Sequence, residues 1–175
     1  MIVLKTDREI GYMRDAGKIV GQTLQELKKA IVPGVTTLEL DRIADQYIRH
    51  AGAIPAFKGY GGFPANICTS VNEQVVHGIP GSRQLNSGDV ISLDVGTKLN
   101  RYYGDAAITV PVGDVDDELL NLLTVTEESL YKGIEKAIKG NRLSDISHAV
   151  QLHAESHGYG VVRDYVGHGI GQRMH

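Results

Sequence analysis

The sequence predicts an α+β fold in which helices cover one side of a single antiparallel sheet. Two helix capping boxes, each followed by apolar residues at helical spacing, open the chain. Strand-like runs bounded by turn signals occupy the middle, and two more helical stretches come after them. Because strands and helices are grouped in this order, one sheet with helices on one face is favoured. A chain of 175 residues is long enough for one domain with a buried core.

The first two elements are predicted to be helices. Residues 6–9 (Thr-Asp-Arg-Glu) have capping-box spacing, and the helix that they open ends at Pro33-Gly34. Residues 36–39 (Thr-Thr-Leu-Glu) form a second box, and its helix closes near Gly52. Because Thr and Glu at these positions satisfy backbone N–H groups of a first turn, both helix starts are specific predictions.

A loop rich in glycine and aromatic residues, at 55–64, separates these helices from the strands. The remaining elements are predicted, in chain order, as strands at 66–71, 89–98 and 101–110, helices at 116–139 and 144–157, and a strand at 161–166.

The composition excludes several classes of protein. Hydrophobic residues make up 42% of the chain and charged residues 22%, values that are usual for a globular protein. The formal charge of −3, with no Lys/Arg cluster, gives no basic field for nucleic acid or an anionic membrane. No apolar run approaches the ~20 residues that span a bilayer. We therefore expect neither nucleic-acid binding nor a membrane anchor.

Cys68 is the only cysteine, so no intrachain disulfide can form. A reducing cytoplasm is therefore the expected compartment. The thiol could act as a nucleophile only with an activating base nearby, and a small buried hydrophobe is the favoured interpretation. The chain has no Gly-x-Ser-x-Gly motif and no complete dinucleotide-binding loop.

Two aspartates occupy corresponding positions in a predicted hairpin. A two-residue turn at Leu99-Asn100 places Asp94 opposite Asp105 on one face of the sheet. Two carboxylates that are ~4.5–5.5 Å apart at Cβ among apolar neighbours need a cation or a shared proton. A divalent metal is the preferred interpretation, and a proton-sharing acid pair is the alternative. A register slip of one residue would instead put them on opposite faces, with one aspartate merely capping a bend.

Two histidines stand in contexts that could present the ring to a site, although a Gly-His-Gly sequence alone is more often a turn, and a third histidine, His175, has no downstream context. His168 has a glycine on each side, which lets the backbone approach another group, and neutral imidazole is a good metal ligand. His77 precedes Gly78 and Pro80, which predict a rigid turn that presents the ring. His175 lies seven residues past His168.

The other histidines are expected to be structural or surface residues: His50, His148, His153 and His157. The pair at 153 and 157 lacks the glutamate directly after the first histidine that a zinc-protease helix requires.

Five segments together resemble the type I methionine aminopeptidases of bacterial type, from the pita-bread metallohydrolase family. They are GYGGFP, CTSVNEQVVHGIPG, DVISLDVG, YYGDAA and YVGHGIGQRMH. The resemblance covers the whole chain. It implies the pita-bread (creatinase/aminopeptidase) fold, an antiparallel sheet covered by helices, in a single metalloaminopeptidase domain over residues 1–175.

The resemblance also implies roles for particular residues. Asp94 would chelate one metal ion, Asp105 would bridge two, and His168 would ligate the second. His77 would hydrogen-bond near the scissile amide or the amino terminus of the substrate, and His175 would bind the substrate carbonyl and the developing oxyanion. The residues implied for the methionine pocket are Phe57, Tyr60, Phe63, Cys68 and Met174, soft and aromatic walls that suit a thioether.

The implied activity is removal of N-terminal methionine from nascent proteins whose second residue is small, by hydrolysis that uses two divalent ions. Co, Mn, Fe, Zn or Ni would all suit the ligands. The implied partners are nascent polypeptide N-termini at the ribosome, and the enzyme is expected to be a cytoplasmic monomer.

The chain departs from the family in one respect. Two further ligands, both glutamates, come in the family from strands beyond the position of His175. The fold is therefore expected to be incomplete at the C-terminus, and the 175-residue chain to be inactive by itself. A non-catalytic pita-bread module that binds protein is the alternative. Prolidases and aminopeptidase P share the fold but carry a large domain before it, whereas the first family helix begins here by Asp7.

Overall fold

The structure is a computed structural model that describes residues 3–175. The chain forms two compact units. The first consists of the described residues up to Asp114 together with His168–His175, and the second is Val115–Gly167.

Two helices of the first unit begin where the capping boxes predict. Helix α1 spans Asp7–Ala30, and helix α2 spans Thr37–His50. In both, the N-cap threonine accepts a hydrogen bond from the backbone N–H of the glutamate three residues on, and that glutamate accepts one from the N-cap N–H. Both predicted helix starts are confirmed.

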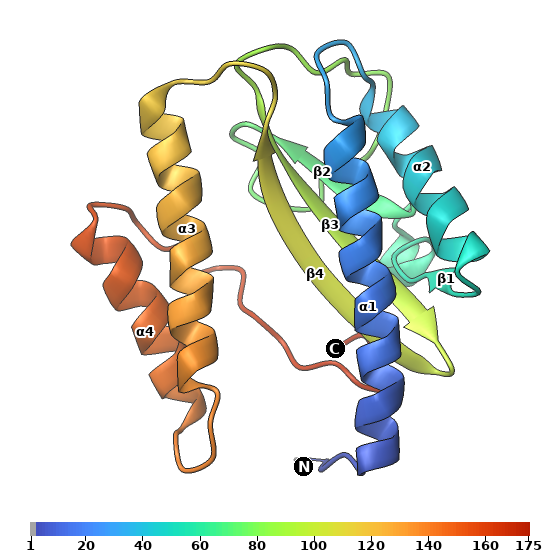
Figure 1. The fold of residues 1–175 in the computed structure, drawn as a ribbon, viewed down its shortest axis with the longest axis vertical. Helices are drawn as coiled ribbons and strands as arrows, with labels where there is room; N and C mark the ends of the chain where they lie inside the picture. The colour runs from blue at the N-terminus through green and yellow to red at the C-terminus, as the bar shows by residue number, and fades with distance from the viewer. Residues whose placement is uncertain (1–2) are drawn as a thin grey trace. The chain divides into compact units, whose positions relative to one another are not determined.

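The sheet of this unit is antiparallel and is built around β3 (Val90–Leu99) (Figure 1). Strand β4 (Tyr102–Pro111) pairs along the whole of β3. Strands β2 (Ile67–Val71) and β1 (Ile54–Pro55) pair with successive parts of β3, and no pattern in the sequence predicts the two-residue β1. The three longer strands are confirmed to within two residues.

The turn between β3 and β4 differs from the predicted one by a residue. Its two central residues are Asn100 and Arg101, with φ values of 50° and 73°, and Leu99 pairs with Tyr102. Two positive φ values are typical of a type I′ turn, whose twist matches that of a hairpin, and Asn adopts this conformation more readily than most residues. The predicted turn at Leu99-Asn100 is therefore wrong, because it would place leucine in the left-handed region.

Helix α1 packs closely on one face of the β3–β4 hairpin. The Thr97 hydroxyl donates to the carbonyl oxygen of Ala16 over 3.0 Å. Gly104 lies against the same turn of α1, so a Cβ added there would be 2.7 Å from the backbone nitrogen of Gly17. The hydrophobic core of this unit contains, among others, the buried residues Leu27, Leu40, Ile48, Ile67, Ile91, Leu93 and Val95.

The second unit is a pair of helices, α3 (Asp117–Lys136) and α4 (Leu143–Ser156), which pack side by side (Figure 1). They approach closely at Gly133, where an added Cβ would be 2.9 Å from a methyl carbon of Val150. Both helices were expected at these places. The strand predicted at 161–166 is wrong, because these residues form no ladder with any described strand.

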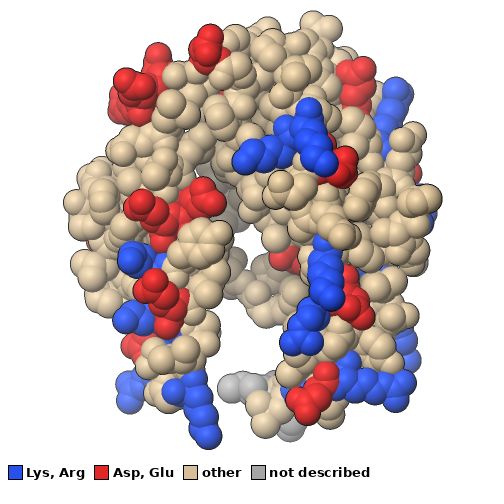
Figure 2. Space-filling view, viewed as in Figure 1, with Lys and Arg blue, Asp and Glu red and all other residues tan. Residues whose placement is uncertain are grey.

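The charge distribution on the surface and the hydropathy of the helices concern binding to nucleic acid and to membranes. Figure 2 shows acidic and basic side chains mixed on the displayed face. Within residues 3–175, no helix is both long and apolar enough to cross a membrane.

Candidate metal centre

Asp94 and Asp105 lie on the same face of the β3–β4 hairpin but not directly opposite each other. Asp94 pairs with Ala107, and Asp105 pairs with Gly96. The observed turn shifts the register by two positions from the predicted one, so the carboxylates are diagonal neighbours. Because an even shift preserves the side-chain alternation, the predicted common face is retained. The prediction that the two aspartates pair directly is therefore wrong. The alternative, a one-residue slip that would put them on opposite faces of the sheet, does not occur.

This face is the one away from α1. Gly104 contacts α1, so the next residue along β4, Asp105, points to the other side of the sheet. On β3 the alternate residues Leu93 and Val95 are fully buried, whereas Asp94 between them is half-buried. The strand alternation thus separates a hydrophobic core from a face that carries the charged groups.

The environment of Asp94 disfavours its charged form. Burial first, and then the nearby charge of Asp105, raise the pKa of the Asp94 carboxyl to about 7. The two carboxyls also share a hydrogen bond. A cation bound between the two carboxylates would replace their lost hydration and would offset the repulsion between their negative charges.

The C-terminal segment brings His168 to this pair. Its Nε2 lies 3.6 Å from Oδ2 of Asp105, and its Nδ1 lies 3.2 Å from the carbonyl oxygen of Gly169. A carbonyl can only accept, so Nδ1 carries the proton and the Nε2 lone pair is left on the Asp105 side.

His175 lies next to His168, on the side of Tyr60. Its ring centroid is 4.1 Å from that of His168, and its Nδ1 is 2.8 Å from the hydroxyl oxygen of Tyr60. The Tyr60 and His175 rings also stack, with centroids 5.5 Å apart. Asp94, Asp105, His168, His175 and Tyr60 thus form one continuous series of contacts.

The donor set fits a divalent metal. Two carboxylates and an imidazole with a free Nε2 are ligands that zinc and its neighbours accept. The separation of 3.6 Å between His168 and Asp105 is too long for a hydrogen bond and suits two ligands of one ion. Among the described residues, the ligand atoms of Asp94, Asp105 and His168 do not all lie within 4.8 Å of one another. A group that does meet this spacing lies on the α3–α4 pair.

The aromatic loop contributes two half-buried rings, Phe57 and Phe63, and the first of them lies beside the strand that carries Asp94. Phe57 lies against Gly96, the partner of Asp105, so closely that a Cβ at that glycine would overlap its ring. The short 3₁₀ turn Tyr60–Gly62 follows and includes two glycines with positive φ. Phe63 closes this loop, since its carbonyl accepts from the N–H of Gly59 over 2.8 Å.

Cys68 and Met174 are the buried members of the predicted pocket. Cys68 pairs with Asp94 across β2 and β3 and is 4% exposed. Burial raises the pKa of its thiol to about 12, with the two aspartate charges adding to the effect, so the unreactive hydrophobe expected from the sequence is supported. Met174 is 2% exposed.

His77 is held in an unusual backbone conformation. Its φ is 58°, and the following Gly78 donates to the Ser70 hydroxyl while accepting from the N–H of Thr69 over 2.8 Å. A Cβ at Gly78 would overlap the carbonyl of Thr69, so only glycine fits there. Residues 77–80 form no turn, because the turn of this loop lies earlier, at Asn72 and Glu73, so the turn predicted at His77 is wrong in its position.

A hydrogen-bond chain that sequence reasoning missed holds the C-terminal segment in place. The Tyr102 hydroxyl donates to Glu9 over 2.7 Å and accepts from the side-chain amide of Gln172 over 2.7 Å. The hydrogen bonds from Thr6 and Tyr102 lower the pKa of the Glu9 carboxyl to about 2. The capping box identifies Glu9, but no local pattern predicts its second partner, 93 residues away.

The chain is similar to known proteins in both sequence and fold. The sequence matches the family described as Metallopeptidase family M24 over residues 11–175. It is 61% identical over 176 residues to methionine aminopeptidase of Clostridium acetobutylicum, covering 100% of this chain and 70% of that protein. It is 59% identical over 175 residues to methionine aminopeptidase 1 of Bacillus subtilis, covering 100% and 71%. The crystal structure of methionine aminopeptidase from Rickettsia prowazekii matches with a TM-score of 0.98 at 43% identity, covering 100% and 71%.

These matches confirm the pita-bread α+β fold and favour a peptidase over a non-catalytic binding module. The chain spans about 70% of the length of these relatives. It belongs to metallopeptidase family M24, among the methionine aminopeptidases.

Proposed function

We propose that the series of contacts from Asp94 to His175 is the catalytic site of a metal-dependent hydrolase that removes N-terminal methionine when the second residue is small. The observation that carries this proposal is the contact between His168 and Asp105 beside the buried carboxyl of Asp94. Relatives named methionine aminopeptidase, at 59% identity and above, support the choice of substrate.

Asp94, Asp105 and His168 would hold two divalent ions, with Asp94 serving one, His168 the second and Asp105 both. When bound, such ions polarise a peptide carbonyl and lower the pKa of a coordinated water. The donor set suits Co, Mn, Fe, Zn or Ni. Because Asp105 already contacts both other ligands, its carboxylate is the one suited to bridging.

His175 is proposed to bind the substrate carbonyl and the oxyanion that develops there. When the Tyr60 hydroxyl donates to Nδ1 of His175, the ring proton lies on Nε2 and can be donated to the oxyanion. The stacked Tyr60 ring holds the imidazole in one orientation, which is the preorganisation that such a donor needs.

His77 is proposed to hydrogen-bond the substrate near its amino terminus or scissile amide. The methionine side chain would contact the pocket formed by Phe57, Tyr60, Phe63, Cys68 and Met174. The glycine- and proline-rich loops beside it are rigid, so only a small second residue would fit beneath them.

The biological setting follows from this substrate. We propose nascent polypeptide N-termini at the ribosome as the partners, a monomer, and a cytoplasmic location. We also propose that the two compact units belong to one metalloaminopeptidase domain over residues 1–175.

A peptide cleavage assay tests this function. A protein of the relatives' length that carries these residues should release Met from Met-Ala-Ser when Co²⁺ or Mn²⁺ is present, and should stop when EDTA is added. It should not cleave Met-Phe-Ser or acetylated Met-Ala-Ser, because the second residue is too large or the amino group is blocked. The 175-residue chain is expected to be inactive. Cleavage of the acetylated peptide, or cleavage in EDTA, would show a different site.

Replacing His77 separates binding of substrate from binding of metal. His77→Ala should leave the metal content unchanged and lower kcat/KM by about 10²–10³-fold, since one hydrogen bond in the transition state is lost. Metal content is measured by elemental analysis and kcat/KM with Met-Ala-Ser. His50→Ala, at the exposed end of α2, is the control and should change neither quantity. A fall in metal content in His77→Ala would make His77 a ligand.

A further inference from the structure

A second group of metal-ligating side chains lies in the α3–α4 unit. One ligand atom each from Glu128, His153 and His157 lies within 4.8 Å of the other two. Glu128 comes from α3, His153 from α4, and His157 is the residue at the C-terminal cap of α4. No residue of the Asp94–His175 series takes part, so this group is separate from the site described above.

The His157 ring is oriented so that one of its nitrogens keeps a lone pair for a ligand. Nδ1 of His157 is 2.8 Å from the carbonyl oxygen of His153, so Nδ1 must donate and Nε2 is left with its lone pair. This pattern, with one ring nitrogen bound to a backbone carbonyl, is the usual support of a metal-bound histidine. The two rings are 4.5 Å apart at their centroids, as the spacing of four residues on a helix predicts.

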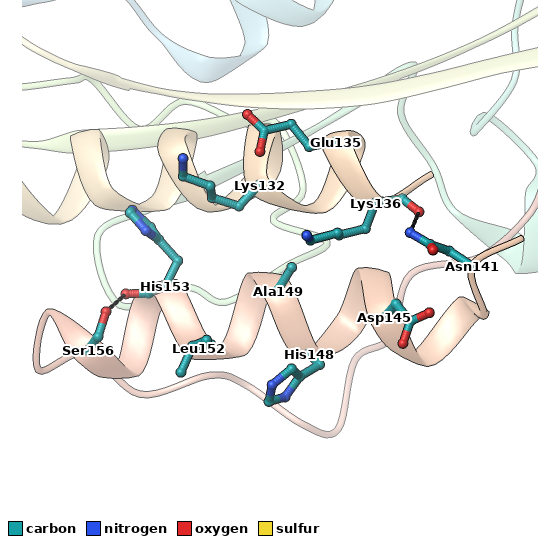
Figure 3. A pocket seen from close by; sticks show the side chains of 10 residues that line it. All are labelled: Lys132, Glu135, Lys136, Asn141, Asp145, His148, Ala149, Leu152, His153 and Ser156. Atoms are coloured by element: carbon teal, nitrogen blue, oxygen red, sulfur yellow. Dashed lines mark hydrogen bonds between the residues drawn. The ribbon is translucent and has the colours of Figure 1, made fainter. Parts of the chain in front are cut away.

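His153 faces the carboxylate of the other helix. Its Nε2 is 2.9 Å from Oε2 of Glu128, and its side chain is only 16% exposed. Zinc bonds of about 2.0–2.2 Å in a tetrahedral site place adjacent donors roughly 3.3–3.6 Å apart, so the two groups would need to move apart by only about half an ångström to bind one ion. Figure 3 shows His153 extending from α4 toward α3, whereas His148 on the same helix points away from α3.

We propose that Glu128, His153 and His157 bind one zinc-type divalent ion, with water as the fourth ligand. Two imidazoles and one carboxylate form a donor set that zinc accepts with an open position. A simple ion pair would need only Glu128 and His153, and the hydrogen bond from His157 Nδ1 to the His153 carbonyl does not require His157 to lie within 4.8 Å of the Glu128 carboxylate. Because the ligands come from two helices, the ion links α3 to α4 at the end where α4 stops.

Comparing two histidines of the same helix tests the site. The 175-residue chain is loaded with Zn²⁺, passed over a desalting column and analysed for bound metal. His157→Ala should retain one equivalent fewer than the parent, whereas His148→Ala should retain the same amount. In titrations, the weakening in His157→Ala should exceed the roughly 10–100-fold that loss of an outer-shell partner costs.

A second experiment uses a variant chain that lacks two proposed metal ligands of the β3–β4 site. In an Asp94→Asn/Asp105→Asn chain, one equivalent of Zn²⁺ should remain and should raise the Tm, because the ion binds the folded state. Adding Glu128→Gln should abolish both effects. Equal zinc in parent, His157→Ala and His148→Ala would overturn the proposal, and so would an equal loss in the two histidine variants, which would indicate nonspecific binding to surface imidazoles. Circular dichroism confirms that each variant keeps its helices.

Discussion

Asp105→Asn is expected to abolish metal binding at the β3–β4 site and, with it, the removal of Met from Met-Ala-Ser. The carboxylate contacts both Asp94 and His168, so its loss affects every ligand of the site. The fall in kcat/KM should exceed the roughly 10²–10³-fold that removal of a single oxyanion donor costs. Asp94→Asn, which removes a ligand of one ion only, should have a smaller effect. The measurements are bound metal and kcat/KM in a protein of the relatives' length.

The same substitution should change how stability depends on pH when no metal is bound. The pKa of Asp94 is raised from 3.8 to about 7 in the folded chain, so protonation stabilises the fold fully below pH about 4. That contribution is lost as the pH rises through 7, and the Tm of the parent in EDTA should fall over this range. Asp105→Asn removes the neighbouring charge, so the fall should be smaller.

Asp117→Asn is the matched control for both measurements. This aspartate lies exposed in the first turn of α3 and should affect stability by no more than about 1 kcal/mol, through the helix dipole. Normal metal content and activity in Asp105→Asn would contradict the proposed bridging role. A pH profile identical to that of the parent would contradict the proximity of the two carboxyls.

Gly104→Ala is expected to be strongly destabilising. The new Cβ would be 2.7 Å from backbone atoms of Ala16 and Gly17, and neither helix nor strand backbone can move aside cheaply. Overpacking of this kind costs about 1–3 kcal/mol, measured as a lower midpoint of urea unfolding. Because Asp105 is the next residue, displacement of β4 should also weaken metal binding.

Gly17→Ala provides the control on the other side of the same contact. A Cβ at Gly17 meets no other atom within 4 Å, and alanine favours a helix by about 1 kcal/mol over glycine. This variant should therefore be as stable as the parent or more stable. Equal stability of Gly104→Ala and the parent would show that α1 and β4 are not packed this closely.

Local patterns in the sequence predict most of the elements of this fold. The two capping boxes identify the starts of α1 and α2 because their hydrogen bonds are formed within four residues. Strand alternation likewise predicts that Asp94 and Asp105 share a face. The register was predicted wrongly because it depends on which residues of the turn can adopt positive φ, and Asn100-Arg101 has a weaker sequence signal than Asn-Gly.

Interactions between distant residues are what the sequence could not predict. The strand expected at 161–166 has a suitable pattern, but a strand exists only when another pairs with it. The link from Glu9 through Tyr102 to Gln172 joins three parts of the chain and leaves no periodic signal. The approach of His157 to Glu128 depends in the same way on how α3 and α4 pack, whereas the exposed position of His157 and the half-buried position of His153 are the surface and core-edge positions that the sequence predicts.

The turn at Asn100 and Arg101 also limits how this hairpin can change in length during evolution. Exposed turns usually accept insertions and deletions. Here an inserted residue that the loop did not take up would move β4 by one position against β3, so Asp105 would turn toward α1 and a residue with a side chain would replace Gly104 against the helix. A three-residue loop with a G1 bulge could absorb the change. Relatives should therefore differ at this surface turn by substitution, or by insertions that a longer loop takes up without moving Asp105 to the other face.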